Sequence, residues 1–229
     1  MNCSKRISLI TELLDPCDTL CDVGCDHGYA CIMAVSEGKA LKAIASDINR
    51  GPLNKAQLNI SCQGLTGKIS TCLSDGLLSV DEPFDALSIC GMGGLLIKKI
   101  IRESQEKAFR VNQMVLSPQS EYYALREYIC METPFYIFSE TSIKDAGKFY
   151  VFFDVRKGNG EKEHITERDL LFGDPALERN PSARRDMLKG MLLEKEHALK
   201  NVLDGTGQRS TERALVLKKE IAYLKELTE

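Results

Sequence analysis

The residue run with the strongest chemical signal is Cys21-Asp22-Val23-Gly24-Cys25-Asp26-His27-Gly28-Tyr29. The run begins within a short apolar stretch, 19–23, and leads through a glycine-bounded turn into a segment with helical spacing. This order is typical of a strand that delivers its carboxyl end to a ligand. Gly24 and Gly28 lack side chains where a backbone must approach a small molecule closely, and Asp22 and Asp26 place carboxylates beside that gap. The run therefore predicts a binding site at the end of this strand.

The carboxylates of this run argue against a bound diphosphate. A dinucleotide-binding turn reads G-x-G-x-x-G with bare amides, whereas this segment reads D-x-G-x-D-x-G. S-adenosylmethionine has no phosphate and carries an ammonium and a sulfonium, so acidic groups around a glycine turn suit it electrostatically. The pattern favours this methyl donor, and its alternative is a tight turn in an ordinary α/β protein.

Acidic residues also follow the next two predicted strands. Asp47 ends the strand 42–46, where a carboxylate can accept both hydroxyls of a ribose. Asp75, which is followed by Gly76, ends the strand 69–73, where it can accept a hydrogen bond from an adenine amino group. The alternatives are an exposed acid at a helix start for Asp47 and a plain Asp-Gly turn for Asp75.

A second glycine-rich segment, Cys90-Gly91-Met92-Gly93-Gly94, follows the fourth predicted strand, 84–89. Three glycines in four residues are costly unless the backbone needs unusual angles or close approach, so we expect a second functional segment here. The glycines also open a helix, and Met92 is either a pocket wall or core filling.

Five strand–helix units finished by an antiparallel pair, 136–141 and 148–155, predict an α/β fold with a seven-stranded sheet and one antiparallel strand. We assign residues 1–157 to this Rossmann-like domain and 158–181 to a linker with an apolar anchor at 170–172. Residues 182–229 carry two apolar stripes at helical spacing, which predict a helical hairpin joined at Gly205-Thr206-Gly207 in the manner of an antiparallel coiled coil.

Composition narrows the class of protein. The net charge of -3 and the pI of about 5.8 show no global basic field for nucleic acid, although the last 48 residues hold ten Lys or Arg against eight Asp or Glu. The nine cysteines form no C-x-x-C motif, so we expect reduced thiols and no metal site. No stretch approaches the ~20 apolar residues of a membrane span, and no signal-peptide core is present, which predicts a soluble cytoplasmic protein.

With these motifs identified, the chain resembles, over its whole length, the bacterial family of tRNA methyltransferases that form N1-methyladenosine at position 22. The resemblance rests on Ser4-Lys5-Arg6, Asp22 to Tyr29, Gly51-Pro52, Asp75-Gly76-Leu77, Cys90 to Gly94, Leu125-Arg126-Glu127, Lys148-Phe149-Tyr150 and Phe172-Gly173. It implies a class I S-adenosylmethionine domain followed by a helical coiled-coil domain that helps to hold tRNA. Gln119 after Pro118 and Asp174 before Pro175 depart from the family pattern, which bears on the base contacts.

The resemblance also assigns roles. Adenine N1 attacks a sulfonium methyl with a free lone pair, so positioning and nearby negative charge suffice. Asp26 is the first candidate for that charge, or it holds the ammonium of the donor; His27 is the second, either in proton transfer or as support of the turn. The cofactor candidates are Asp22, Gly24, Gly28, Asp47, Asp75, Gly76 and Cys90.

Substrate contacts are expected from three places. Gly91, Met92, Gly93 and Gly94 form the floor of the base pocket, with Gln119 beside them. Tyr150, or Phe149, stacks on the flipped base or belongs to the core. Lys5 and Arg6 contact the polyanion or form a solvated helix face.

Two rival classes remain open. One is a class I methyltransferase that acts on a small molecule or a protein, for which the cationic helical hairpin has no evident use. The other is a non-catalytic nucleotide-binding module whose coiled coil recruits a partner or forms a dimer. We expect tRNA as the partner, no membrane, no metal and a monomer or weak dimer.

Overall fold

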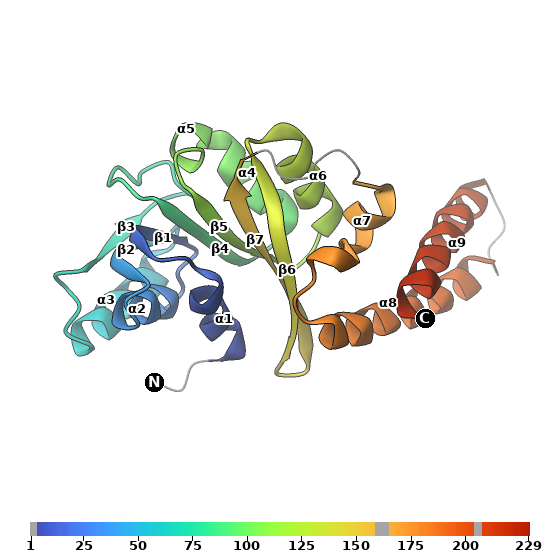
Figure 1. Ribbon diagram of the computed structural model, residues 1–229, viewed down its shortest axis with the longest axis horizontal. Coiled ribbons are helices and arrows are strands. Elements are labelled where there is room, and N and C mark those ends of the chain that lie inside the picture. Colours follow the sequence, from blue (N-terminus) through green and yellow to red (C-terminus); the bar gives the residue numbers. More distant parts are fainter. Residues whose placement is uncertain (1–3, 159–164, 204–207) are drawn as a thin grey trace.

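A seven-stranded sheet with strand order β3-β2-β1-β4-β5-β7-β6 forms the centre of the molecule (Figure 1). The computed structural model describes residues 4–158, 165–203 and 208–229. Its strands are β1 Cys17–Val23, β2 Ala40–Asp47, β3 Ile69–Leu73, β4 Ala86–Met92, β5 Gln113–Pro118, β6 Phe135–Asp145 and β7 Lys148–Lys157. Strands β1 to β5 are parallel, and β7 is antiparallel to both β5 and β6. The predicted sheet with one reversed strand is confirmed.

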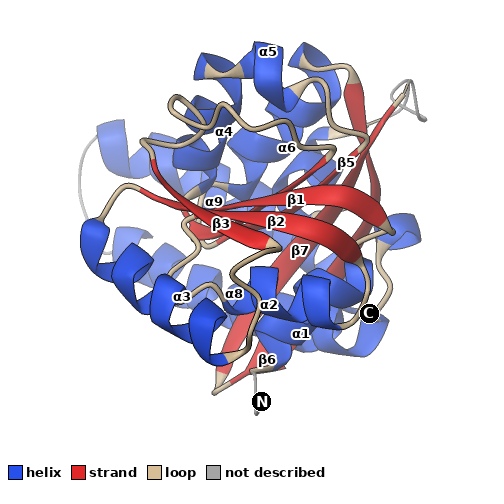
Figure 2. Cartoon of the chain, turned by 90° about the vertical axis from the view of Figure 1, so that its left-hand side faces the viewer, coloured by secondary structure: helices blue, strands red, loops and turns tan. Residues whose placement is uncertain are grey.

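The central strands form because they are apolar on both faces, as parallel strands covered by helices must be. All six residues of β5 are buried, and Leu20, Leu87 and Leu116 in the three central parallel strands are fully buried. Figure 2 shows α1, α2 and α3 on one face of the sheet and α4, α5 and α6 on the other. The sheet is therefore the middle layer of three. The carboxyl ends of its strands form the edge at which open α/β sheets bind ligands.

The helices that cover the sheet precede β1 or lie between successive strands in the chain. They are α1 Lys5–Leu13, α2 Tyr29–Ser36, α3 Arg50–Cys62, α4 Gly94–Glu103, α5 Gln105–Ala108 and α6 Tyr122–Glu132. Pro52 is the third residue of α3, a position where the missing N–H costs no helical hydrogen bond. Of the five predicted strand–helix units, the third has turns in place of a helix, over residues 74–85.

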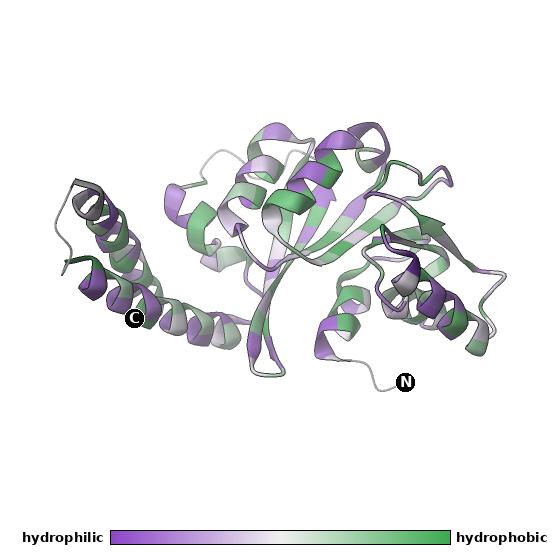
Figure 3. Cartoon of the chain, turned by 180° about the vertical axis from the view of Figure 1, so that it is seen from behind, coloured by the Kyte–Doolittle hydropathy of each residue, from purple (hydrophilic) through white to green (hydrophobic). Residues whose placement is uncertain are grey.

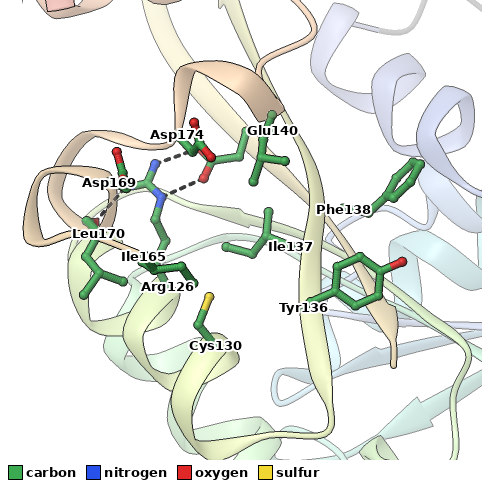
Figure 4. A pocket seen from close by; sticks show the side chains of 11 residues that line it. Arg126, Cys130, Tyr136, Ile137, Phe138, Glu140, Ile165, Asp169, Leu170 and Asp174 are labelled. Carbon is green, nitrogen blue, oxygen red and sulfur yellow. Dashed lines mark hydrogen bonds and ion pairs between the residues drawn. The ribbon is translucent and has the colours of Figure 1, made fainter. Parts of the chain in front are cut away.

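The interval predicted as a linker contains regular structure in its described part: helix α7, Glu167–Phe172, and a short 3-10 helix, η1, Pro175–Leu177. Thr166 and Asp169 form a capping box that starts α7. Figure 4 shows the contact that holds it, a buried pair between Arg126 of α6 and Glu140 of β6, with two N···O distances of 2.8 Å. Arg126 also donates to the carbonyl oxygen of Leu170 at 3.0 Å. These contacts fasten α7 to the sheet edge.

The last two helices, α8 Pro181–Leu203 and α9 Gln208–Thr228, pack against each other and extend from one end of the molecule (Figure 3). Arg185, near the start of α8, donates to the carbonyl oxygen of Thr228 at the end of α9, and Lys195, ten residues further along α8, pairs with Glu220, an order that requires antiparallel helices. Leu188 of α8 and Leu224 of α9 are fully buried where they meet. The predicted helical hairpin is confirmed for its two helices, while its connection at 205–207 lies outside the described residues.

Within the described residues, no helix combines the length and the apolar character that crossing a membrane requires.

Candidate functional site

The acidic and glycine-rich segments meet at the carboxyl edge of β1, β2 and β4. In the register of the sheet, Val23 lies beside Ser46 on one side and Ile89 on the other. The strand order reverses between β1 and β4, and open α/β sheets bind ligands at such a switch point. The sheet thus brings the ends of three predicted strands to one place.

The turn after β1 has a fixed, left-handed backbone. Gly24, Asp26 and Gly28 have φ values of 76°, 49° and 73°. The amides of Gly24 and Cys25 donate to the carbonyl oxygen of Ser46, and the Asn59 side chain donates to the carbonyl oxygen of His27 at 3.0 Å. Aspartate is among the few residues other than glycine that tolerate this conformation, so Asp26 is suited to the turn by its backbone as well as its charge.

Asp22, the second-to-last residue of β1, is a buried acidic residue at the edge of the site. Ser88 of β4 donates a 2.5 Å hydrogen bond to Asp22 Oδ1. The pKa of Asp22 is raised to about 6, mainly by burial and in part by the nearby Asp47, whereas the Ser88 hydrogen bond opposes the shift. Ser88 was not among the predicted residues, although a hydroxyl in the apolar strand 86–90 is a signal that sequence reading could have used.

One pocket collects most of the predicted cofactor and catalytic candidates. Its lining includes Asp22, Gly24, Asp26, His27 and Cys90 from the two glycine-rich segments, joined by Arg6, Ile7 and Ile10 of α1. The Asp26 carboxylate, 75% exposed, lies 3.4 Å from the His27 ring nitrogen Nε2. The first helix therefore forms one wall of the pocket, and Asp26 and His27 lie together at its edge.

Asp47 and Asp75 lie at the ends of the neighbouring strands β2 and β3. Asp47 is 9% exposed, and its Oδ1 accepts a hydrogen bond from the amide of Asn49 at 2.8 Å. Its carbonyl oxygen accepts from the amide of Ser74, which orders the turn before Asp75. Asp75 itself is exposed. Both carboxylates are thus on the same edge as Asp22, one held by the backbone and one free to meet solvent.

Three of the candidate glycines are closely packed against other parts of the protein. The methyl group of Met92 occupies the space that a Cβ at Gly24 would fill. A Cβ at Gly28 would lie 3.1 Å from the Ala56 Cβ of α3, and one at Gly76 would lie 3.0 Å from Ile100 of α4. We predicted a bare backbone for close approach of a ligand at Gly24 and Gly28, and Gly76 as a further cofactor-binding candidate. The structure shows close packing of helices and Met92 at these positions.

The second glycine-rich segment packs against the loop after β5. A Cβ at Gly94 would lie 2.5 Å from the Glu121 carbonyl oxygen, and the Gly94 amide donates to the Ser120 carbonyl oxygen at 2.9 Å. A Cβ at Gly93 would meet the Ser120 and Glu121 side chains. The two loops therefore lie in direct backbone contact beside the site.

Of the substrate candidates, Gly91 and Gln119 lie together. The Gln119 side chain lies 3.6 Å from where a Cβ of Gly91 would be, and the backbone amide of Gln119 donates to the Met92 carbonyl oxygen at 2.8 Å. Arg6 lies over the Tyr150 ring at 5.2 Å, whereas Lys5 is exposed at the start of α1. The Tyr150 ring is half-buried and, like Cys90 and Ile143, packs against a buried cluster that includes Ile10 and Phe152.

The thiols of the site are poor nucleophiles. Burial raises the pKa of Cys25 and of Cys90 far above that of a free thiol, so both stay protonated at neutral pH. Within 4–158, 165–203 and 208–229, no group of three or more His, Cys, Asp or Glu side chains could hold a metal ion.

Comparison with known proteins identifies the family. Residues 3–153 match the model of the methyltransferase domain. The tRNA (adenine(22)-N(1))-methyltransferase of Bacillus subtilis is 31% identical over 157 residues, which are 68% of this chain and 66% of that protein. Sp1610 of Streptococcus pneumoniae, a candidate tRNA (m1A22) methyltransferase, is 29% identical with a TM-score of 0.87, covering 99% of this chain and 100% of that one. Its complex with S-adenosyl-L-methionine is 28% identical with a TM-score of 0.83 and covers 99% of each chain. The chain therefore belongs to the methyltransferase-domain family, in the group that contains the Bacillus subtilis tRNA (adenine(22)-N(1))-methyltransferase.

Proposed function

We propose that this protein transfers a methyl group from S-adenosylmethionine to N1 of adenine 22 in tRNA. The observation that carries the proposal is the pair of buried carboxylates, Asp22 and Asp47, at the ends of adjacent strands β1 and β2 on either side of the Gly24 turn. A site with this charge suits a cationic nucleoside and repels a diphosphate. Membership of the methyltransferase family and the activity of the Bacillus subtilis relative support the same reaction.

The residues present fit the methyl donor. In the described part of the chain the buried Asp22 carboxylate accepts one hydrogen bond, from Ser88, and pairs with no cation, so an ammonium would complete it. In this proposal Asp47 accepts the ribose hydroxyls and the exposed Asp75 accepts from the adenine amino group. When bound, S-adenosylmethionine supplies a methyl group on a positively charged sulfur.

The chemistry asked of the protein is mainly positioning. Adenine N1 uses its lone pair to form the new N–C bond while the C–S bond breaks and its electron pair stays on sulfur, so no proton has to leave first. The product base carries a positive charge, which Asp26 at the pocket edge can stabilise. His27, in contact with Asp26 and anchored through Asn59, orients that carboxylate.

The direct test combines purified protein, unmodified tRNA transcript and labelled donor, followed by mapping of reverse-transcription stops. We expect one methyl group per tRNA and a stop at adenine 22. A stop elsewhere in the D-arm would overturn the position. Incorporation into small molecules or proteins, and none into tRNA, would favour the rival methyltransferase class.

Replacing Asp47 with Ala should weaken donor binding by about 10- to 100-fold, since one charged acceptor of two hydroxyls is lost. Isothermal titration with S-adenosylmethionine measures the change. Asp81→Ala is a matched control, because Asp81 is an exposed acid in the loop after β3. Affinity that is unchanged in Asp47→Ala would remove the ribose assignment.

Replacing Asp26 with Asn should lower kcat about 10- to 100-fold while donor affinity changes less than threefold, because Asn keeps the left-handed turn and loses only the charge. The kinetics of Asp26→Ala should show at least the same loss. If donor affinity falls instead and kcat is kept, Asp26 holds the ammonium rather than the product cation.

We further propose a cytoplasmic protein that works as a monomer or weak dimer. The proposed tRNA substrate and the free cysteines of the described residues support this location. Light scattering at micromolar concentration measures the assembly, and a stable dimer would contradict this part of the proposal.

A further inference from the structure

The β6–β7 hairpin extends past the carboxyl edge of the sheet. Leu116 of β5 pairs with Phe153 of β7, which pairs with Glu140 of β6, so the last β5 residue, Pro118, is level with Ser142. Three further β6–β7 pairs lie beyond that level: Ile143 with Tyr150, Lys144 with Phe149 and Asp145 with Lys148. Figure 1 shows this tip projecting between α1 and α8. We call residues 143–150 the hairpin tip.

One side of the hairpin tip is attached to the wall of the pocket. The Arg6 amide donates to Asp145 Oδ2 at 3.4 Å, and the Arg6 guanidinium lies over the Tyr150 ring. Ile143 and Tyr150 pack against the buried side of α1. Because Arg6 also lines the pocket that contains Asp26 and His27, the hairpin tip lies directly beside the pocket entrance.

The base of the hairpin tip is fixed from the other direction. The amide and hydroxyl of Ser142 donate to the Glu178 carboxylate at 2.9 and 2.7 Å. Asn180, just before α8, donates from its side chain to the Ser142 carbonyl oxygen at 2.9 Å. The hairpin tip is therefore held in place between α1 and the start of α8.

The hairpin tip carries two lysines on opposite faces: in the β6–β7 register Lys144 is paired with Phe149, and Lys148 with Asp145. Lys144 and Lys148 are exposed, and in the described part of the chain neither forms an ion pair with a carboxylate. The Lys144 ammonium lies 5.1 Å from the centre of the half-buried Phe149 ring. Unpaired lysines beside an aromatic ring are the groups that proteins use to contact phosphates and unstacked bases. This local charge stands out in a chain whose net charge is -3.

We propose that the hairpin tip binds the sugar–phosphate backbone of the RNA next to the target nucleotide, through Lys144 and Lys148, with Phe149 as a stacking face. This inference rests on the proposed function. It gives the lysines a role in RNA affinity that is independent of base sequence, because phosphate contacts position a nucleic acid without reading it. Of the RNA, only the extruded adenine then enters the pocket.

The test measures tRNA binding and methylation by wild type and by the double variant Lys144→Gln/Lys148→Gln at several salt concentrations. We expect KM and Kd for tRNA to rise about 10-fold, with kcat at saturating tRNA and the affinity for S-adenosylmethionine unchanged. The slope of log affinity against log salt should fall by about 1.4 to 1.8, the value for two phosphate contacts. Charge reversal, Lys144→Glu/Lys148→Glu, should produce a larger loss.

A matched control is Lys42→Gln/Lys68→Gln, two exposed lysines near the amino ends of β2 and β3, at the opposite edge of the sheet. The inference would be overturned by an equal loss in this control, or by a wild-type KM and salt slope in the hairpin variant. In either case, methylation of tRNA by the wild-type protein would still support the proposed function. Wild-type protein that methylates a protein and no RNA would overturn both. Phe149→Ala should weaken RNA binding without altering the salt slope.

Discussion

Asp22→Asn should stabilise the ligand-free protein at pH 7.5 and, at the same pH, weaken S-adenosylmethionine binding at least 10-fold. Wild-type Asp22 must ionise in a buried position, where its pKa of about 6 replaces the ordinary 3.8. A raised pKa means that the folded state holds the proton more tightly than the unfolded chain between these values. The contribution of Asp22 to stability is therefore highest below pH 4 and is lost as the pH rises through 6.

The pKa shift sets an upper limit of about 3 kcal/mol, from 1.36 kcal/mol per pH unit, on the stability gained by removing the charge. The Asn amide still accepts from Ser88 but needs its own acceptor, so we expect about 1 to 3 kcal/mol, or a rise of several degrees in Tm. Calorimetry from pH 4 to 8 measures it: the gain of Asp22→Asn over wild type should vanish near pH 4.

The matched control is Asp18→Asn, an exposed acid on the same strand, which should leave both Tm and donor affinity unchanged. A lower Tm for Asp22→Asn at pH 7.5 would mean that the charge is compensated in the folded protein. Full donor affinity in that variant would show that Asp22 does not meet the ammonium.

Arg126→Met should destabilise the protein by about 3 to 5 kcal/mol, because it leaves the Glu140 carboxylate buried without its partner. Both side chains are only 5% exposed. The same change removes the donors to the Leu170 and Leu171 carbonyl oxygens, so α7 should exchange its amide hydrogens faster. Urea unfolding and hydrogen exchange measure the two effects.

Two comparisons separate loss of the ion pair from loss of packing. Arg126→Met/Glu140→Met should be more stable than Arg126→Met, since no unpaired charge remains. Lys98→Met breaks the surface pair with Glu132 and should cost less than about 1 kcal/mol. If Arg126→Met costs no more than Lys98→Met, the buried pair does not hold α7.

The parts of the fold that sequence predicts are those whose signal is local. The apolar run of β5, the alternation of β6 and β7 and the Asp-Ala-Gly turn between them each depend on neighbouring residues. Helix α7 was missed because its six residues are held by Arg126 and Glu140, which are distant in sequence. The β3–β4 turns were missed because nothing in the apolar spacing there excludes a short helix.

The same distinction between local and long-range signals applies to the residues of the site. Acids at strand ends follow from the order of strands, which is why Asp22 and Asp47 could be named before their neighbours were known. The partners across the sheet could not: Ser88 meets Asp22 only through the pairing of β1 with β4. The spacing of glycines likewise does not tell a ligand from a neighbouring helix, as Gly28 against Ala56 shows.

The contacts of β6 with α7 and with the start of α8 have a consequence for RNA binding. Arg126 and Glu140 fix one side of this strand, and Ser142 is fixed by Glu178 and Asn180. The long C-terminal helices and the rim of the pocket are thus preorganised relative to each other. An RNA that contacts both does not have to order a flexible connection between them. Binding therefore avoids the loss of conformational entropy that such ordering would cause.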